Sequence, residues 1–215
     1  MRTVRVEKAV EMIPDGATIM VGGFMGVGTP ERLIDECVRQ RKRDLTVIAN
    51  DTAIPGRGIG KLIDAGLVTR AITSHIGLNS ETQRQMIAKQ MEVDLVPQGT
   101  LIERIRAGGF GLGGVLTPTG VGTVVENGKQ KITVDGKEYL LETALRAQFA
   151  LVNAFLADYS GNLYYALTAR NFNPIIAMAA DTTVVAADHI VPVGTIPPDH
   201  VVTPAPVVDY LVQNG

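Results

Sequence analysis

The sequence of 215 residues is poor in several residue types, and each shortage excludes a class of protein. It has one cysteine, Cys37, so an internal disulfide framework is impossible, which fits a reducing cytoplasm. Its three histidines, His75, His189 and His200, have no metal-ligand spacing with one another or with Cys37. We therefore expect neither a disulfide scaffold nor a metal site.

Charge of one sign and long hydrophobic runs are also missing. The chain has 20 Lys and Arg against 22 Asp and Glu, a formal charge of −2, which argues against nucleic acid as a partner. No apolar stretch approaches the length of a membrane span, and the N-terminal residues lack a secretory pattern. With 46% hydrophobic residues, the composition predicts one soluble, cytoplasmic domain over residues 1–215 with no membrane partner.

What the chain does contain is an alternation of apolar strand-like runs with amphipathic helical segments. This alternation predicts an α/β fold: an open, mostly parallel sheet with helices on both faces and a small β-hairpin region. The expected strands are 17–22, 45–49, 68–74, 93–97, 148–154 and 182–187. The expected helices lie near 4–13, 30–40, 59–65, 80–90 and 100–107.

The remaining segments are expected to be turns and loops. Residues 108–122 are rich in glycine, threonine and proline without periodicity, which predicts a long loop of functional importance. Asp135-Gly136 between two β-rich runs predicts a hairpin, and residues 158–162 predict the turn of another strand pair.

Several helix ends carry recognisable signals. Thr29-Pro30 predicts a helix start, since Thr can cap and Pro suits the first helical position. Capping boxes are expected at Ser80 with Gln83 and at Thr100 with Glu103, and Gly108 is the expected stop of the latter helix. Cys37 shares a helix face with Leu33 and Ile34, which predicts a buried thiol.

The most informative segment is Asp15–Pro30, in which a short strand runs into a loop with four glycines, Gly22, Gly23, Gly26 and Gly28. A strand that delivers such a loop to a helix N-terminus can receive phosphate or developing negative charge, although any tight strand–helix turn has a similar composition. The loop lacks the lysine of a Walker motif. A dinucleotide pattern occurs only at Gly109–Gly114, where no strand precedes it.

Six motifs together resemble those of one family. These are the Asp-Gly, strand, Gly-Gly-Phe and Gly-x-Pro run of residues 15–30, then Asn50-Asp51-Thr52, Pro97-Gln98-Gly99-Thr100, Ile105–Gly109, Thr117–Thr123 and Ala169–Pro174. The chain resembles the α (A) subunit of the family I coenzyme A transferases over nearly its whole length, the closest type being acetate, butyrate and acetoacetate CoA-transferases. The resemblance implies the fold shared by CoA-transferases and sugar isomerases.

The resemblance also implies ping-pong transfer of CoA between short-chain carboxylic acids through a glutamyl-CoA thioester. In the family this glutamate sits on the companion β subunit, so the implied partner is that β subunit in an α2β2 assembly or a multiple. CoA is then a substrate, acyl-CoA and carboxylates are the other ligands, and no cofactor is expected. Glu126-Asn127-Gly128 resembles the surroundings of the family's glutamate, yet it leads into a charged turn, so we interpret Glu126 as a turn residue.

Three groups of residues are candidates for the site. Gln98 follows a predicted strand, and by resemblance its amide would donate to the oxyanion of the tetrahedral intermediate. Gly22, Gly23, Phe24, Met25, Gly26, Val27 and Gly28 are the expected contacts of CoA, with core packing as the alternative for Phe24 and Met25. Arg170 and Asn173 are open between catalytic and structural roles: Asn173 could cap a helix and Arg170 could meet a carboxylate.

Two other functions remain open from sequence. A sugar-phosphate isomerase-like enzyme would use a similar loop but needs an acid–base set of Asp, Glu or His, and none is evident. A non-enzymatic sensor of CoA or phosphate would bind its ligand without a companion chain.

Overall fold

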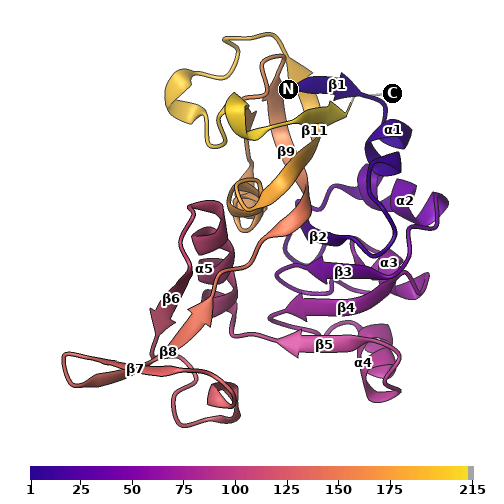
Figure 1. Cartoon of the computed structure of the whole chain (residues 1–215). Coiled ribbons are helices and arrows are strands. Elements are labelled where there is room, and N and C mark those ends of the chain that lie inside the picture. Colours follow the sequence, from indigo (N-terminus) through magenta and orange to yellow (C-terminus); the bar gives the residue numbers. More distant parts are fainter. Residues whose placement is uncertain (213–215) are drawn as a thin grey trace.

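The computed structural model describes residues 1–212 and contains two sheets of unequal size (Figure 1). Within these residues the large sheet has nine strands in the order β1-β12-β11-β9-β2-β3-β4-β5, with β10 paired to β9. All neighbours in that order run parallel, and only β10 is antiparallel to its partner. The strands of this sheet are β1 (Arg2–Val4), β2 (Thr18–Val21), β3 (Leu45–Ile48), β4 (Val68–Thr73), β5 (Glu92–Leu95), β9 (Ala147–Asp158), β10 (Leu163–Tyr164), β11 (Ala180–Val191) and β12 (Tyr210–Val212).

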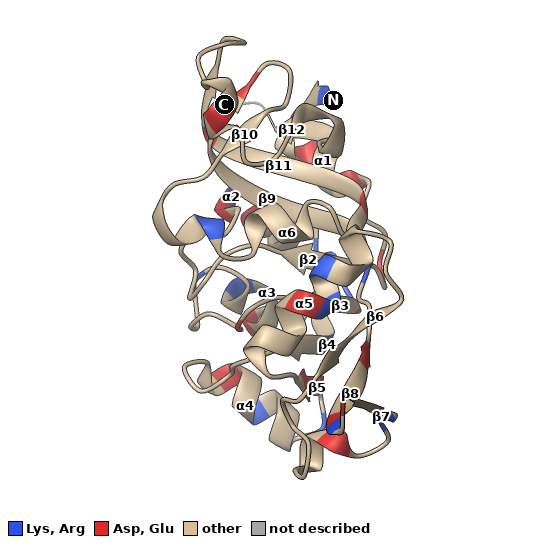
Figure 2. Ribbon diagram, turned by 90° about the vertical axis from the view of Figure 1, so that its left-hand side faces the viewer, with Lys and Arg blue, Asp and Glu red and all other residues tan. Residues whose placement is uncertain are grey.

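Helices cover both faces of the large sheet and bury a separate core on each. The helices are α1 (Val6–Glu11), α2 (Glu31–Arg39), α3 (Gly60–Asp64), α4 (Ser80–Ile87), α5 (Gln98–Gly109) and α6 (Asn173–Ile176). On one face α1, α2 and α3 pack on the sheet, and Cys37 is fully buried there, as expected. On the other face α5 and α6 pack on β2, β9 and β11, as Figure 2 shows from the front. The predicted α/β fold with helices on both faces is confirmed.

The side of the sheet on which the chain adds successive strands changes between the neighbouring parallel strands β2 and β9. From β2 the chain adds β3, β4 and β5 on one side, and from β9 it adds β11 and β12 on the other. In open parallel sheets, ligands bind outside the carboxyl ends of the strands at such a reversal. The glycine loop leaves β2 at this edge, so the topology places it where a ligand site is expected.

A small antiparallel sheet of three strands lies apart from the large one, at the lower left of Figure 1. It consists of β6 (Gly114–Thr117), β7 (Lys131–Val134) and β8 (Lys137–Thr143) in the order β6-β8-β7. The hairpin of β7 and β8 turns at Asp135-Gly136 as predicted, with both residues at positive φ. The expected long loop over 108–122 is wrong in part, because α5 extends to Gly109 and residues 114–117 form β6, which pairs with the distant β8.

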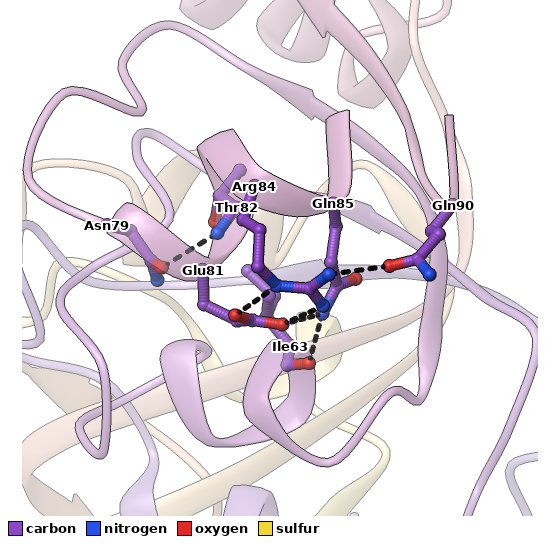
Figure 3. A network of polar contacts seen from close by, with 7 residues as sticks. All are labelled: Ile63, Asn79, Glu81, Thr82, Arg84, Gln85 and Gln90. Atoms are coloured by element: carbon purple, nitrogen blue, oxygen red, sulfur yellow. Dashed lines mark hydrogen bonds and ion pairs between the residues drawn. The ribbon is translucent and has the colours of Figure 1, made fainter. Parts of the chain in front are cut away.

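Two of the expected helix ends are displaced. Asn79, not Ser80, caps α4, since its side chain accepts a hydrogen bond of 3.0 Å from the amide of Thr82 (Figure 3). Helix α5 begins at Gln98, two residues before the expected capping box, and Glu103 pairs with Arg106. Both errors have the same cause. A residue of the capping type shows that a helix begins nearby, but it does not fix the residue at which the helix begins.

The remaining end signals also differ from expectation. Helix α2 begins after Pro30 without a side-chain cap, so Thr29 does not cap it. Helix α5 ends in a Schellman turn at Gly111, which has φ +73, while the amide of Leu112 donates to Ala107 O at 2.9 Å. Gly108 is not the stop: a Cβ there would lie 2.0 Å from Leu145 O, so close packing requires this glycine.

Charged residues are dispersed over the molecule. Lys and Arg segments alternate with Asp and Glu segments on the side shown in Figure 2. None of the helices among residues 1–212 combines the length and the apolarity needed to cross a membrane.

Candidate active site

The glycine loop between β2 and α2 folds into a tight hairpin. The amide of Phe24 donates to Val27 O and the amide of Val27 donates to Phe24 O, both at 2.9 Å. Met25 and Gly26, the two central residues, have φ values of 49° and 82°, the pattern of a type I′ turn. Phe24, Met25 and Val27 are 42%, 36% and 43% exposed, so the alternative of core packing for Phe24 and Met25 is wrong.

The glycines of this loop are required by the packing of the chain itself. A Cβ on Gly22 would lie 1.8 Å from Asn173 Oδ1, and a Cβ on Gly23 would lie 2.3 Å from Thr29 Oγ1. A Cβ on Gly28 would lie 2.7 Å from Ala169 Cβ. The loop therefore offers a ligand its three exposed side chains, and its contact with CoA stays a prediction.

Asp51, which lies just after the next strand β3, accepts a hydrogen bond from the tip of the hairpin. Its Oδ2 accepts hydrogen bonds from the amide of Met25 at 2.9 Å and from Asn50 Nδ2 at 2.7 Å. Its Oδ1 accepts one from the amide of Ala53 at 2.7 Å. Three N–H donors thus stabilise a carboxylate that is only 7% exposed.

Asn50 links this carboxylate to Gln98. Its Oδ1 accepts a hydrogen bond of 3.2 Å from Gln98 Nε2, and its carbonyl accepts from Ser74 N and Ser74 Oγ at 3.0 and 2.6 Å. Asn50 and Asp51 follow β3, and Gln98 follows β5 as the first residue of α5. A chain of hydrogen bonds therefore runs along the carboxyl edge of the sheet from Met25 to Gln98, and Gln98 lies at the edge where the sequence placed it.

Asn173 is a buried residue that links the end of the glycine loop to β9 by hydrogen bonds. Its Oδ1 accepts from the amide of Asn153 at 2.9 Å, and its Nδ2 donates to Gly28 O and Ala169 O at 2.8 and 3.0 Å. It is the first residue of α6, whose N-cap is Phe172, so the expectation that Asn173 caps this helix is wrong. Its contacts fix the position of the glycine loop relative to β9.

Arg170 lies outside this network. Its Nε donates to Tyr165 O at 3.1 Å, and its guanidinium carbon lies 5.4 Å from the centre of the Tyr164 ring. These contacts replace the carboxylate partner considered from sequence, and they favour a structural role in packing the segment before α6.

An open groove adjoins the base of the hairpin at the strand-order reversal. It has a volume of about 680 Å³, and its lining includes Gly28, Thr29, Asn153 and Asp188. A groove in this position, beside exposed apolar side chains, is suited to a ligand with both polar and apolar parts.

The comparison with known proteins decides the family. The family model for coenzyme A transferase matches residues 3–214. This chain belongs to the coenzyme A transferase family. It is 57% identical over 213 residues to the acetate CoA-transferase subunit alpha of Escherichia coli K12, covering 99% of this chain and 97% of that protein.

Two further similarities extend this result. The chain is 47% identical over 213 residues to the acetoacetyl-CoA:acetate/butyrate CoA transferase alpha subunit of Clostridium acetobutylicum, covering 99% of this chain and 98% of the relative. The crystal structure of glutaconate coenzyme A-transferase from Acidaminococcus fermentans has the same fold, with a TM-score of 0.85 at 19% identity over 99% of this chain and 75% of that one.

Glu126 of this CoA transferase is engaged by its own loop and by the start of β7. Its Oε2 accepts from the amide of Gly122 at 2.6 Å and pairs with Lys131 Nζ at 2.9 Å. These two donors hold the pKa of Glu126 below its ordinary value. A carboxylate held by two donors at a short helical turn is a structural group, in agreement with its interpretation as a turn residue.

Other reactive side chains are engaged or buried. Glu103 pairs with Arg106, and Asp94 pairs with Arg70 at 2.6 Å. Burial raises the pKa of the Cys37 thiol to about 12, so it carries no thiolate near neutral pH. Among residues 1–212, no three His, Cys, Asp or Glu side chains are grouped as metal ligands are.

Asn50 and Asp51 are the site residues that sequence reasoning missed. Their motif contributed to the family resemblance, but neither residue received a role. A signal for them existed: both directly follow the predicted strand 45–49, and the carboxyl ends of parallel strands share the ligand edge with the glycine loop and Gln98.

Proposed function

We propose that this chain is the α subunit of a CoA-transferase that exchanges CoA between acetate and short-chain acyl groups, acetoacetyl included. The observation that carries the proposal is the 57% identity over 99% of the chain to the α subunit of an acetate CoA-transferase. The relative named for acetate/butyrate transfer supports the same substrate class.

The nucleophile comes from a β subunit in this proposal. That subunit supplies a glutamate whose carboxylate attacks the thioester carbonyl of acyl-CoA and later holds CoA as a glutamyl thioester. The carboxylates of this chain near the carboxyl edge support such a division of labour, because Asp51 already accepts three hydrogen bonds. We propose an α2β2 assembly, or a multiple of it, acting in the cytoplasm.

Within the shared site, this chain stabilises charge and positions the substrate. Attack on the thioester carbonyl converts its oxygen into an oxyanion, and an amide N–H aimed at that oxygen lowers the barrier. Gln98 is the donor that we assign to this role, since its Nε2 carries a second hydrogen besides the one donated to Asn50.

CoA is a substrate in this scheme, and the chain needs no resident cofactor. We assign the exposed side chains of Phe24, Met25 and Val27, with the groove beside Gly28, to contacts with the bound thioester end of CoA. Apolar side chains at the loop tip suit the pantetheine chain, whose methylene and methyl groups gain from leaving water.

Co-expression with the adjacent reading frame tests the proposal. The purified complex should exchange CoA between acetate and butyryl-CoA or acetoacetyl-CoA, and the lone chain should not. Incubation of the complex with acyl-CoA should produce a CoA adduct that mass spectrometry locates on a glutamate of the partner chain. An adduct on any residue of this chain, or full exchange by the lone chain, would contradict the proposal.

The two alternatives from sequence make different predictions. A sugar-phosphate isomerase requires an acid–base set, and membership in the CoA transferase family removes the reason to expect one here. A sensor domain would bind CoA tightly as a lone chain and gain no exchange activity on addition of a second subunit. Isothermal titration of the lone chain with CoA, beside the exchange assay, separates these cases.

A further inference from the structure

Two adjacent residues after β3 connect the glycine hairpin to Gln98, and we propose that Asn50 and Asp51 are a positioning pair for the transfer reaction. Asn50 orients the amide of Gln98, and Asp51 fixes the tip of the hairpin. The inference rests on the proposed function, in which Gln98 donates to the oxyanion.

The first half of the pair acts on Gln98. A glutamine side chain has three rotatable bonds, and holding it in one conformation costs conformational entropy. Asn50 Oδ1 accepts one of the two hydrogens of Gln98 Nε2, which fixes the amide plane and leaves the other hydrogen for a ligand. Gln98 is therefore ordered before substrate arrives, as electrostatic preorganisation requires.

Asn50 is itself held too firmly to follow Gln98. It is 2% exposed, its carbonyl accepts two hydrogen bonds from Ser74, and its Nδ2 donates to Asp51 Oδ2. A buried amide with its donor and acceptor atoms engaged is a rigid reference for the exposed side chain beside it.

The second half of the pair acts on the hairpin. Met25 has φ 49°, a left-handed conformation that is unfavourable for a residue other than glycine. The hydrogen bond from the amide of Met25 to the Asp51 carboxylate stabilises this conformation. Backbone strain that is maintained by a buried carboxylate points to a functional reason for the shape of this loop.

The contacts of Asn50 and of the hairpin tip meet at one atom, Asp51 Oδ2. Asp51 Oδ2 accepts from both Met25 N and Asn50 Nδ2, so a shift of the hairpin tip changes the hydrogen bonds of the residue that orients Gln98. A ligand that settles on the hairpin is thereby coupled to the geometry of the donor amide.

A double-mutant cycle in the reconstituted complex tests the arm to Gln98. Asn50→Ala should lower kcat about 10- to 100-fold with little change in KM for acyl-CoA. In a Gln98→Ala background the same substitution should cause only a small further loss of about 2- to 3-fold, because Asn50 acts mainly through Gln98 and only its donation to Asp51 remains. The conservative Asn50→Gln, which keeps an amide oxygen to accept from Gln98 and an amide nitrogen to donate to Asp51, should restore part of the lost kcat and serves if Asn50→Ala folds poorly.

Thr52→Val is the matched control for the same loop. Thr52 is 1% exposed and its hydroxyl has no hydrogen-bond partner among residues 1–212, so the substitution preserves volume and removes no polar contact seen there. Its kcat should stay within about 2-fold of the wild-type value.

Hydrogen exchange on the lone chain tests the arm to the hairpin without any assay of activity. Amides of residues 22–28 should exchange at least 10-fold faster in Asp51→Asn, because one carboxylate acceptor becomes a donor, and should be unchanged in Thr52→Val. Multiplicative losses in the kinetic cycle, or equal exchange in Asp51→Asn and wild type, would overturn the positioning pair. An inactive wild-type complex would instead count against the proposed function, while the exchange result still decides the hairpin arm.

Discussion

Glycines with the same backbone torsion can be glycine for different reasons, as Gly28 and Gly56 show. Their φ values are +74° and +75°, yet a Cβ on Gly28 would lie 2.7 Å from Ala169 Cβ, whereas a Cβ on Gly56 would have no atom of the described residues within 4 Å, apart from its own chain neighbours. Substitutions at these two glycines therefore separate two losses of folding stability: one from placing a Cβ on left-handed backbone, and one from overlap of that Cβ with a neighbour.

Alanine substitutions at these two positions should differ in stability. Gly56→Ala should lower the free energy of unfolding by about 1 kcal/mol, the cost of left-handed backbone for a residue with a Cβ. Gly28→Ala should lower it by a further 1–3 kcal/mol, because the added methyl group overlaps Ala169. Urea denaturation of the two variants measures the difference, and equal losses would contradict the packing reason.

A second prediction for a single residue concerns the side chain of Gln98. Gln98→Ala should lower kcat of the complex by about 10²–10³, the usual effect of losing one oxyanion donor. Its stability should change by less than about 0.5 kcal/mol, because the side chain is exposed and makes one hydrogen bond of 3.2 Å.

Gln130→Ala is the control for this prediction. Gln130 is another exposed glutamine, and it lies on the small sheet's side of the molecule, next to β7. Its substitution should leave kcat unchanged in the exchange assay. A normal kcat for Gln98→Ala would remove Gln98 from the mechanism.

At the scale of elements, helix α4 shows how a cap is identified. Asn79 is fully buried, accepts from the amide of Thr82, and donates through Nδ2 to Thr52 O at 2.7 Å. Asn79→Ala should cost about 1–3 kcal/mol, since it removes the cap and leaves a buried carbonyl unpaired. Ser80→Ala, at the exposed neighbour favoured by the sequence, should cost less than about 0.5 kcal/mol in the same thermal or urea titration.

The exposed side of the same helix has a pH-dependent network. Hydrogen bonds from Arg84 and Gln85 lower the pKa of Glu81 to about 2 (Figure 3). A carboxylate whose pKa falls on folding contributes stability above its unfolded pKa of about 4.5, and that contribution is lost as the pH falls toward 2. The urea midpoint of wild type should therefore fall more steeply than that of Glu81→Gln between these pH values, and parallel curves would contradict the network.

Elements defined by local pattern were predictable, and those defined by distant partners were not. The strands of β2 to β5 and the helices α1 to α5 follow apolar periodicity, and their predicted ranges match within a few residues. Strand β6 has no alternating pattern that would reveal it in the sequence. It forms because its partner β8, more than 20 residues away in the chain, supplies its hydrogen bonds. The ends of β9 and β11 extend to Asp158 and Val191 for the same reason, since each strand is paired along its length with the other.

The same distinction applies to the site. Gln98 and the glycine loop were identified because strand ends and glycines are visible in the sequence. Asn50 and Asp51 received no role, since their importance depends on groups 48 and 26 positions away that meet them only in the folded sheet, as the Asn50–Gln98 and Met25–Asp51 bonds show. The four glycines were recognised and assigned to ligand access, which stays a prediction, while their close contacts with Asn173, Thr29, Arg57 and Ala169 are visible only in the structure.

At the scale of the whole molecule, the carboxyl edge of the sheet presents several exposed apolar side chains. Phe24, Met25, Val27, Ile54 and Leu95 are each between 36% and 53% exposed around the polar chain from Asp51 to Gln98. Exposed apolar side chains around a polar centre are typical of surfaces that become buried against another protein.

Hydrogen exchange of the assembled complex tests this surface. On addition of the partner subunit, residues 22–28 and 97–100 should gain protection, while residues 41–43, in the loop before β3 at the opposite end of that strand, should not. Protection confined to 41–43 would place the partner at the wrong edge of the sheet for a shared site.

The pairing of β1 with β12 has a consequence for how the protein is made. Residues 2–4 are synthesised about 200 residues before their hydrogen-bonding neighbours, residues 210–212. Strand β1 therefore cannot pair with β12 until the whole intervening segment has been synthesised, so this edge of the sheet forms late in folding.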